Sequence, residues 1–138
     1  MKILVINCGS SSLKYQLIDM DTQLVVAKGL AERIGMDTGK LTHKYGRDCE
    51  EKFVVDTCFK DHTSAIQLVL EALVDKDHGV IADVKEIGAV GHRVLHSGED
   101  FKCSVVVDDD VIAKCKKNID LGPLHMPGNI SCVEACRE

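Results

Sequence analysis

Several features are missing from this sequence, and each absence excludes a class of protein. No apolar run approaches the roughly 20 residues of a membrane-spanning helix, and the apolar stretch after Met1 is too short for the core of a signal peptide. Positive charge is not in excess, because 17 Lys+Arg stand against 22 Asp+Glu and give a formal net charge of -5. We therefore expect a cytoplasmic protein that binds neither a membrane nor nucleic acid.

Internal repeats, low-complexity tracts and linkers rich in Pro, Gly or Ser are also absent, so nothing divides the 138 residues into two parts. Hydrophobic residues make up 45% and charged residues 28%, which is ordinary for a folded domain and excludes disorder. The sequence is interpreted as one domain spanning residues 1–138.

The cysteines number seven, which is odd, and their spacing is irregular. A secreted disulfide framework normally has an even number, so we expect reduced, mostly buried thiols that pack as small hydrophobes. A zinc-binding module is an alternative, with Cys132 and Cys136 as its best feature. Structural zinc sites need a second pair of ligands, and no convincing second pair exists.

The hydrophobic patterns predict a mixed α/β domain rather than a regular alternation of strands and helices. The predicted elements are strands at 3–6, 13–18 and 24–27, a polar-faced hairpin insertion at 40–45 and 51–55, a helix with Ser64 and Gln67 as its capping box, strands at 84–94 and 103–107, and a helix at 108–118. The first three strands are expected to form an antiparallel meander.

The last residues also follow a helical pattern. Asn129 suits an N-cap, and Ile130, Val133 and Cys136 share one face of a helix. The sequence stops at Glu138 without a Gly or Pro terminator. We expect a helix there that the sequence cuts.

A first candidate ligand segment lies between the first two predicted strands. Residues 7–14 read NCGSSSLK. Gly9 lets backbone N–H groups approach an anion, the serines add donors, and Lys14 supplies positive charge. A P-loop would need a wider spacing and a following helix, whereas an alternating strand follows here. The segment suits a phosphate, although a Gly-Ser hairpin turn with a surface lysine explains it equally well.

A second candidate segment, residues 91–99, reads GHRVLHSGE and follows a predicted apolar strand, where α/β sheets carry ligands. Arg93 can hold a carboxylate or phosphate through two parallel hydrogen bonds. His92 and His96 are a poor metal pair, because residues four apart in a strand are separated by ~13 Å. A hydrogen-bonded structural role is favoured for each histidine.

A third segment, residues 121–129, reads LGPLHMPGN and precedes the last predicted helix. Its prolines make a rigid loop that can aim Leu124 and His125 into a cleft beside a helix N-terminus. Taken alone, the segment is typical of a connecting loop.

Together the three segments resemble the acetate kinase family, short-chain acyl kinases of the actin/Hsp70/sugar-kinase superfamily. The family patterns are NxGSSSxK, GHRVVHGGE and LxPLHNPAN, and this sequence departs from them at Leu95, Ser97, Met126 and Gly128. The resemblance implies an α/β fold of the actin-like ATPase (ribonuclease H-like) type. Such a fold has a mixed sheet, with a three-stranded antiparallel meander followed by alternating helices and strands.

The resemblance also implies roles for individual residues. Ser10, Ser12 and Lys14 would contact ATP and the transferring phosphoryl group, Asn7 would help hold Mg²⁺, Arg93 would bind the substrate carboxylate, and Leu95, Leu124 and His125 would shape the acyl pocket. No catalytic residue is assigned within this sequence, because the family's catalytic aspartate, arginine and histidine lie beyond residue 138. Leu95, in place of a valine, leaves acetate and propionate open as substrates.

The implied activity is reversible, Mg²⁺-dependent transfer of the γ-phosphoryl group of ATP to acetate, giving acetyl phosphate and ADP. The sequence would be the N-terminal domain of a homodimeric enzyme, inactive and monomeric on its own. Two alternatives are a propionate or butyrate kinase, and a non-catalytic phosphate-binding or nucleotide-binding module on the same scaffold.

Overall fold

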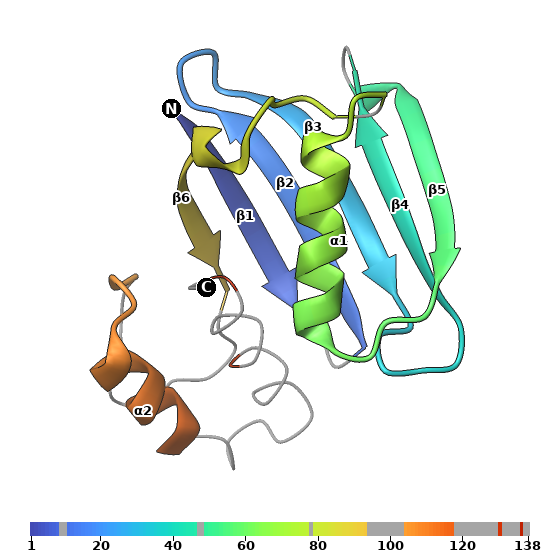
Figure 1. Ribbon diagram of the computed structural model, residues 1–138. Coiled ribbons are helices and arrows are strands. Elements are labelled where there is room, and N and C mark those ends of the chain that lie inside the picture. Colours follow the sequence, from blue (N-terminus) through green and yellow to red (C-terminus); the bar gives the residue numbers. More distant parts are fainter. Residues whose placement is uncertain are drawn as a thin grey trace.

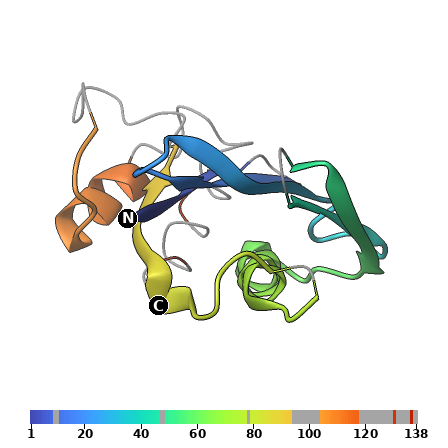
Figure 2. The same ribbon diagram turned by 90° about the horizontal axis from the view of Figure 1, so that it is seen from above.

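One sheet with a helix against one of its faces makes up most of the computed structural model (Figures 1 and 2). The structure describes residues 1–8, 11–46, 49–77, 79–93 and 104–117, together with Ile130 and Cys136. The elements are β1 (Lys2–Cys8), β2 (Ser12–Asp19), β3 (Leu24–Glu32), β4 (Gly39–Tyr45), β5 (Glu51–Thr57), α1 (His62–Val74), the short 3-10 helix η2 (Val84–Glu86), β6 (Ile87–His92) and α2 (Asp109–Lys117).

The sheet has six strands in the order β5-β4-β3-β2-β1-β6. Strands β1 to β5 are antiparallel neighbours, whereas β6 returns through α1 and pairs parallel with β1. The predicted α/β class and mixed sheet are confirmed. The predicted hairpin insertion is not separate from the meander: β4 pairs with β3, so the meander has five strands instead of three. Leu41 and His43 of β4 are fully buried, and this inward alternation explains why the hairpin joins the main sheet.

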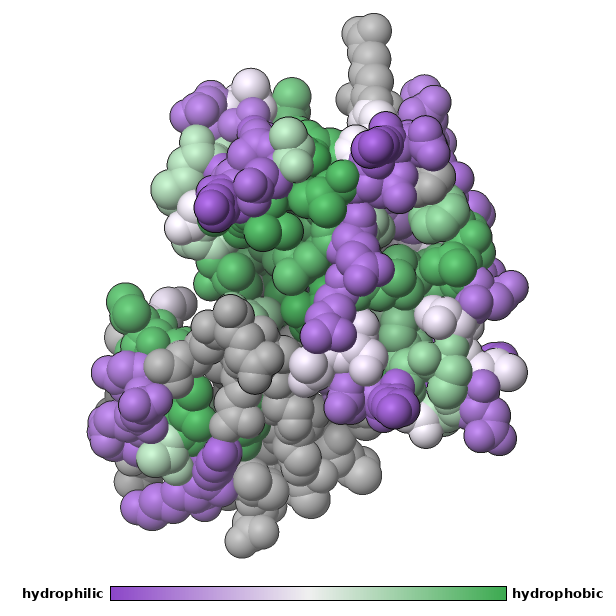
Figure 3. Space-filling model, viewed as in Figure 1, coloured by the Kyte–Doolittle hydropathy of each residue, from purple (hydrophilic) through white to green (hydrophobic). Residues whose placement is uncertain are grey.

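The core lies between α1 and the inward face of the sheet. Alternate residues of the central strands, among them Leu4, Ile6 and Leu17, are buried together with Ile66 and Val69 of α1. Hydrophilic side chains follow the outward side of α1, and apolar ones flank it (Figure 3). Because a strand alternates its side chains between faces, residues next to these core positions lie on the opposite, outward face of the sheet.

The N-terminus of α1 differs from the sequence prediction. The capping box at Ser64 and Gln67 is wrong, because α1 begins at His62 and Asp61 is its N-cap. The Asp61 carboxylate accepts hydrogen bonds from the Ser64 backbone N–H at 2.9 Å and from the Ser64 hydroxyl at 3.0 Å. Ser64 is therefore the third helical residue, whose N–H needs a partner outside the helix.

Replacing Asp61 with alanine is expected to lower the free energy of unfolding by about 1 kcal/mol, because the Ser64 N–H loses its acceptor. Hydrogen bonding from that N–H lowers the pKa of Asp61 below its usual range. The charged cap therefore contributes fully above the unfolded-state pKa of about 3.9 and is lost as the pH falls through the lower folded-state pKa. Urea unfolding of the wild type and Asp61→Ala at pH 7 and below pH 3 measures this, with Asp61→Asn as the uncharged control. An equal difference between wild type and Asp61→Ala at both pH values would contradict it.

Two predicted strands need correction. Within residues 84–93, the described part of the strand predicted at 84–94, Ile87–His92 forms a strand, whereas Asp83 caps the short helix η2 before it. Residues 104–107, the described part of the strand predicted at 103–107, do not form a strand, and Val106 is 90% exposed. A run of β-branched residues favours extended backbone, but a strand also needs a paired neighbour.

The second helix confirms the prediction for 108–118. Its side-chain interactions include the Asp108 carboxylate, which accepts from the Val111 N–H at 2.9 Å, and an ion pair between Asp110 and Lys114 at 3.1 Å. The helix predicted after Asn129 lies outside the described residues except for Ile130 and Cys136. Within the described ranges, no helix is long and apolar enough to cross a membrane.

Candidate functional site

Three strands bring the first two candidate segments to one end of the sheet. Asn7, near the end of β1, is paired directly with Lys14, near the start of β2. Arg93 follows the last residue of β6, and its backbone N–H donates to the Ile6 carbonyl oxygen at 3.1 Å. Arg93 therefore lies beside Asn7 on the neighbouring parallel strand, although 86 positions separate them in the sequence.

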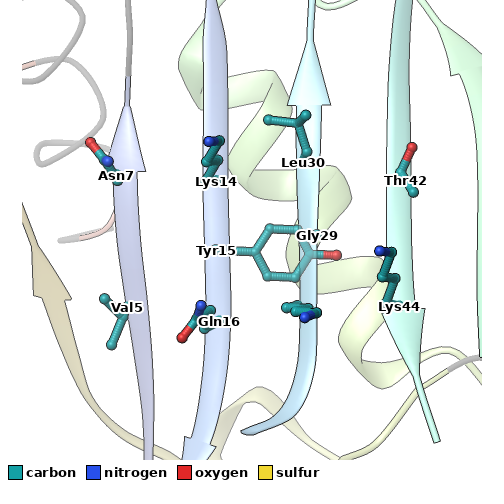
Figure 4. Close-up of a pocket in the computed structure, with 10 residues that line it drawn as sticks. Val5, Asn7, Lys14, Tyr15, Gln16, Gly29, Leu30, Thr42 and Lys44 are labelled. Carbon is teal, nitrogen blue, oxygen red and sulfur yellow. The ribbon is translucent and has the colours of Figure 1, made fainter. Parts of the chain in front are cut away.

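These residues also share a face. Ile6 is fully buried toward α1, so Asn7 and its partner Lys14 lie on the outward face, where both are exposed. Figure 4 views this face, with Asn7 and Lys14 in front and α1 behind the strands. His92 pairs with Ile6, so alternation places Arg93 on the outward face too. The end of the sheet where β1 and β6 finish and β2 begins, called the edge below, thus combines an amide, an ammonium and a guanidinium group.

The ring of His92 supports the backbone at Arg93. Its Nδ1 lies 2.7 Å from the Arg93 carbonyl oxygen, which only accepts, so Nδ1 carries a proton and donates. Burial lowers the pKa of His92, and the bond to Arg93 opposes that shift in part, so the ring is neutral at pH 7. One ring nitrogen of His92 is thus hydrogen-bonded to the backbone, while its Nε2 is buried without a hydrogen-bond partner among the described residues.

A hollow of about 560 Å³ opens on the outward face beside this edge. It extends from Asn7 and Lys14 across β3 to Thr42 and Lys44 of β4 (Figure 4). Its charged lining groups are Lys14, Lys28 and Lys44, and no carboxylate is among the described residues that line it. This surface suits an anion with several oxygen atoms.

A family model for acetokinases matches residues 2–138. The chain belongs to the acetokinase family. Among curated members, it is 58% identical over 138 residues to the acetate kinase of Thermoanaerobacter pseudethanolicus and 59% identical to that of Caldanaerobacter subterraneus. Each match covers 100% of this chain but 34% of the relative, so the chain spans about a third of the length of these acetokinases.

Solved structures of acetokinases have the same fold. The Porphyromonas gingivalis acetate kinase matches with a TM-score of 0.91 and 42% identity over 97% of this chain and 33% of its own. A propionate kinase from Francisella tularensis matches with a TM-score of 0.84 and 35% identity over 99% of this chain and 33% of its own.

The structure describes some of the predicted site residues of this acetokinase chain and leaves the others outside the described ranges. Asn7, Ser12, Lys14 and Arg93 lie at the same end of the sheet, with Ser12 half-buried at the start of β2. The predicted residues that lie outside the described ranges are Ser10, Leu95, Leu124 and His125.

Lys28 and Lys44 were missed by the sequence analysis. Each occupies an outward position of an alternating strand, which is a visible signal, but only strand register shows that they lie beside Lys14 and Asn7. Register between distant strands is not readable from periodicity.

The described ranges contain no group of three or more His, Cys, Asp or Glu residues that would hold a metal ion. Among the described residues at the edge, side-chain oxygen atoms that could bind a cation include the Asn7 amide and the Ser12 hydroxyl. A divalent cation bound mainly through substrate phosphates needs few protein ligands, and one amide oxygen fits that arrangement.

Proposed function

We propose that this chain is the N-terminal, phosphate-binding and acyl-binding domain of an acetate kinase. In that reaction a carboxylate oxygen of acetate attacks the γ-phosphorus of ATP. A new C(O)O–P bond forms, and the P–O bond to ADP breaks. The observation that supports this proposal best is the backbone hydrogen bond from Arg93 to Ile6, because it brings the proposed carboxylate-binding residue beside Asn7, which is proposed to act at the phosphate.

In this proposal Lys14, with the Ser10 and Ser12 hydroxyls, neutralises and orients the phosphoryl group. Arg93 holds the acetate carboxylate through paired N–H donors, which lysine does not reproduce. Phosphoryl transfer depends mainly on positioning and charge neutralisation, and these residues supply both. No nucleophilic side chain is required, since the substrate carboxylate attacks directly.

Mg²⁺ is part of the proposal, with Asn7 contributing an amide oxygen and the nucleotide phosphates supplying most of its ligands. The metal would neutralise phosphate charge. Leu95, Leu124 and His125 are proposed to shape the acyl pocket. The cytoplasmic location, and a homodimer for the longer protein, also stay predictions.

A propionate kinase is a second candidate, favoured by the structural match to the Francisella tularensis enzyme. The two are separated by the ratio of kcat/KM for acetate, propionate and butyrate, measured on a longer protein that contains this chain. Acyl phosphate is trapped as the hydroxamate in the presence of ATP and Mg²⁺. Absence of acyl phosphate with all three acids would contradict both kinase proposals and favour a non-catalytic phosphate-binding module.

The 138-residue chain alone is expected to show no appreciable acetyl phosphate formation, because it spans about a third of the curated relatives' length. The same hydroxamate assay, run with equal molar amounts of this chain and of the longer protein, measures the difference. Turnover of the short chain equal to that of the longer protein would refute this prediction.

A further inference from the structure

Three lysines stand in a row across the outward face of the sheet. Strand register puts Lys28 of β3 directly opposite Lys44 of β4, and Lys44 directly opposite Lys52 of β5. All three are exposed. Directly opposed like charges on neighbouring strands are destabilising. The row therefore has an energetic cost that the fold does not require.

A further lysine of β4 shows the usual arrangement, in which a charged residue lies opposite residues of the other charge. Lys40, also outward on β4, lies opposite Glu32 on one side and Asp56 on the other. By contrast, the directly opposed neighbours of Lys28 are Gln16 and Lys44, and those of Lys44 are Lys28 and Lys52. The row therefore lacks the acidic cross-strand neighbours that Lys40 has.

The lining and the volume of the hollow indicate which kind of anion it suits. Lys28 and Lys44 line it together with Lys14, and Gln16 and Thr42 add hydrogen-bonding groups. Its volume of about 560 Å³ lies within the range of small-molecule sites, and the hollow is open to solvent along the sheet face. Lys28 and Lys44 lie directly opposite each other on strands roughly 4.8 Å apart. Lys14 lies opposite Leu30, so it is a diagonal neighbour of Lys28 at roughly 7–8 Å. Long ammonium side chains at these spacings reach successive phosphates of one chain.

We propose that this hollow binds a chain of linked phosphates, with Lys28 and Lys44 contacting oxygens of the groups farthest from Asn7. Lys28 and Lys44 lie on strands that the proposed transfer edge does not use, so the inference extends the proposed function. Of the three lysines that line the hollow, only Lys14 has a role that rests on the proposed function.

The test is calorimetric titration of the 138-residue chain with inorganic tripolyphosphate at low ionic strength. The double variant Lys28→Gln/Lys44→Gln is expected to bind at least tenfold more weakly. The control Lys40→Gln removes a lysine from the same strand and face but from outside the hollow, and is expected to change affinity less than twofold. Without ligand, the double variant is expected to unfold at an equal or higher urea concentration, because it relieves repulsion.

Three outcomes would overturn the inference: no binding of tripolyphosphate by the wild type, equal loss in the double variant and Lys40→Gln, or equally tight binding of a glutamate peptide of the same net charge. These results are separate from the hydroxamate assay. A functional kinase whose isolated chain does not bind tripolyphosphate refutes this inference alone, whereas binding without acyl phosphate formation refutes the proposed function alone.

Discussion

Replacing Gly29 with alanine is expected to lower the free energy of unfolding by about 3 kcal/mol, at the upper end of the usual cost of overpacking a core. A Cβ atom at Gly29 would lie 2.5 Å from the Tyr15 hydroxyl oxygen and closer still to the backbone carbonyl oxygen of Thr42. The Thr42 oxygen belongs to the sheet ladder, so it has little room to move. The strand pairing between β3 and β4 would have to shift.

The reason for a glycine at this position is a hydrogen bond that crosses a whole strand. Register aligns Tyr15, Gly29 and His43 on β2, β3 and β4. The Tyr15 ring extends over Gly29 (Figure 4), and its hydroxyl lies 2.5 Å from Nδ1 of His43. Burial raises the pKa of Tyr15, so the hydroxyl keeps its proton. A methyl group at Gly29 displaces Tyr15 and leaves a buried hydroxyl without this partner.

Gly91 provides the matched control. It is also a strand glycine, in β6, but a Cβ there meets no atom of the described residues within 4 Å. Gly91→Ala is therefore expected to change stability by less than about 0.5 kcal/mol. Urea unfolding followed by circular dichroism measures both variants. Equal effects of the two substitutions would show that the Tyr15–His43 contact does not explain Gly29.

A double-mutant cycle separates the two causes. Tyr15→Phe removes the hydroxyl oxygen that the new methyl group would meet at 2.5 Å, while the ring carbon Cζ at 2.6 Å and the Thr42 carbonyl oxygen remain. Gly29→Ala is therefore expected to cost less in the Tyr15→Phe background than in the wild type. A cost that is the same in both backgrounds would show that the hydroxyl contributes nothing, and would assign the effect to the aromatic ring and the Thr42 carbonyl.

Local patterns predicted the parts of the fold that depend on local interactions. A continuous apolar run located β1, alternation located β2, and the polar turn between them indicated their antiparallel pairing. Acidic residues at its start located α2. The capping error at Ser64 arose because Asp61 and Ser64 are both good capping residues, and the sequence does not show which one the chain turns at. The valines at 105–107 have the right propensity but lack a strand partner among the described residues, so propensity alone was misleading.

The features that depend on cross-strand register were not predictable in the same way. The Tyr15–His43 bond joins residues 28 positions apart, and the lysine row spans three strands. A shift of one residue in either pairing would reverse which face each side chain occupies. For the candidate site, the resemblance identified Asn7, Lys14 and Arg93 as residue types in motifs. Their proximity follows from the parallel pairing of β6 with β1, which only the structure shows.

Replacing Arg93 with alanine, in a longer protein that contains this chain, is expected to lower kcat/KM for acetate by about 100-fold or more. A bidentate contact with a carboxylate contributes roughly 3 kcal/mol, and each 1.4 kcal/mol is a factor of ten. Arg93→Lys is expected to recover only a small part of the activity, because an ammonium group presents no planar pair of donors. The KM for ATP should change little, since the guanidinium group is proposed to contact the acyl substrate.

Two further measurements distinguish this role from a structural one. Added guanidinium ion should partly restore acetyl phosphate formation by Arg93→Ala, because a small cation with the same donors can occupy the vacated space. Arg33→Lys, a substitution at an arginine whose described side-chain partner is Thr38, should leave kcat/KM within twofold of the wild type. If Arg93→Ala instead raised the KM for ATP and left that for acetate unchanged, the guanidinium group would belong to the phosphate-binding half of the edge. The proposed division between the end of β6 and the β1–β2 hairpin would then be wrong.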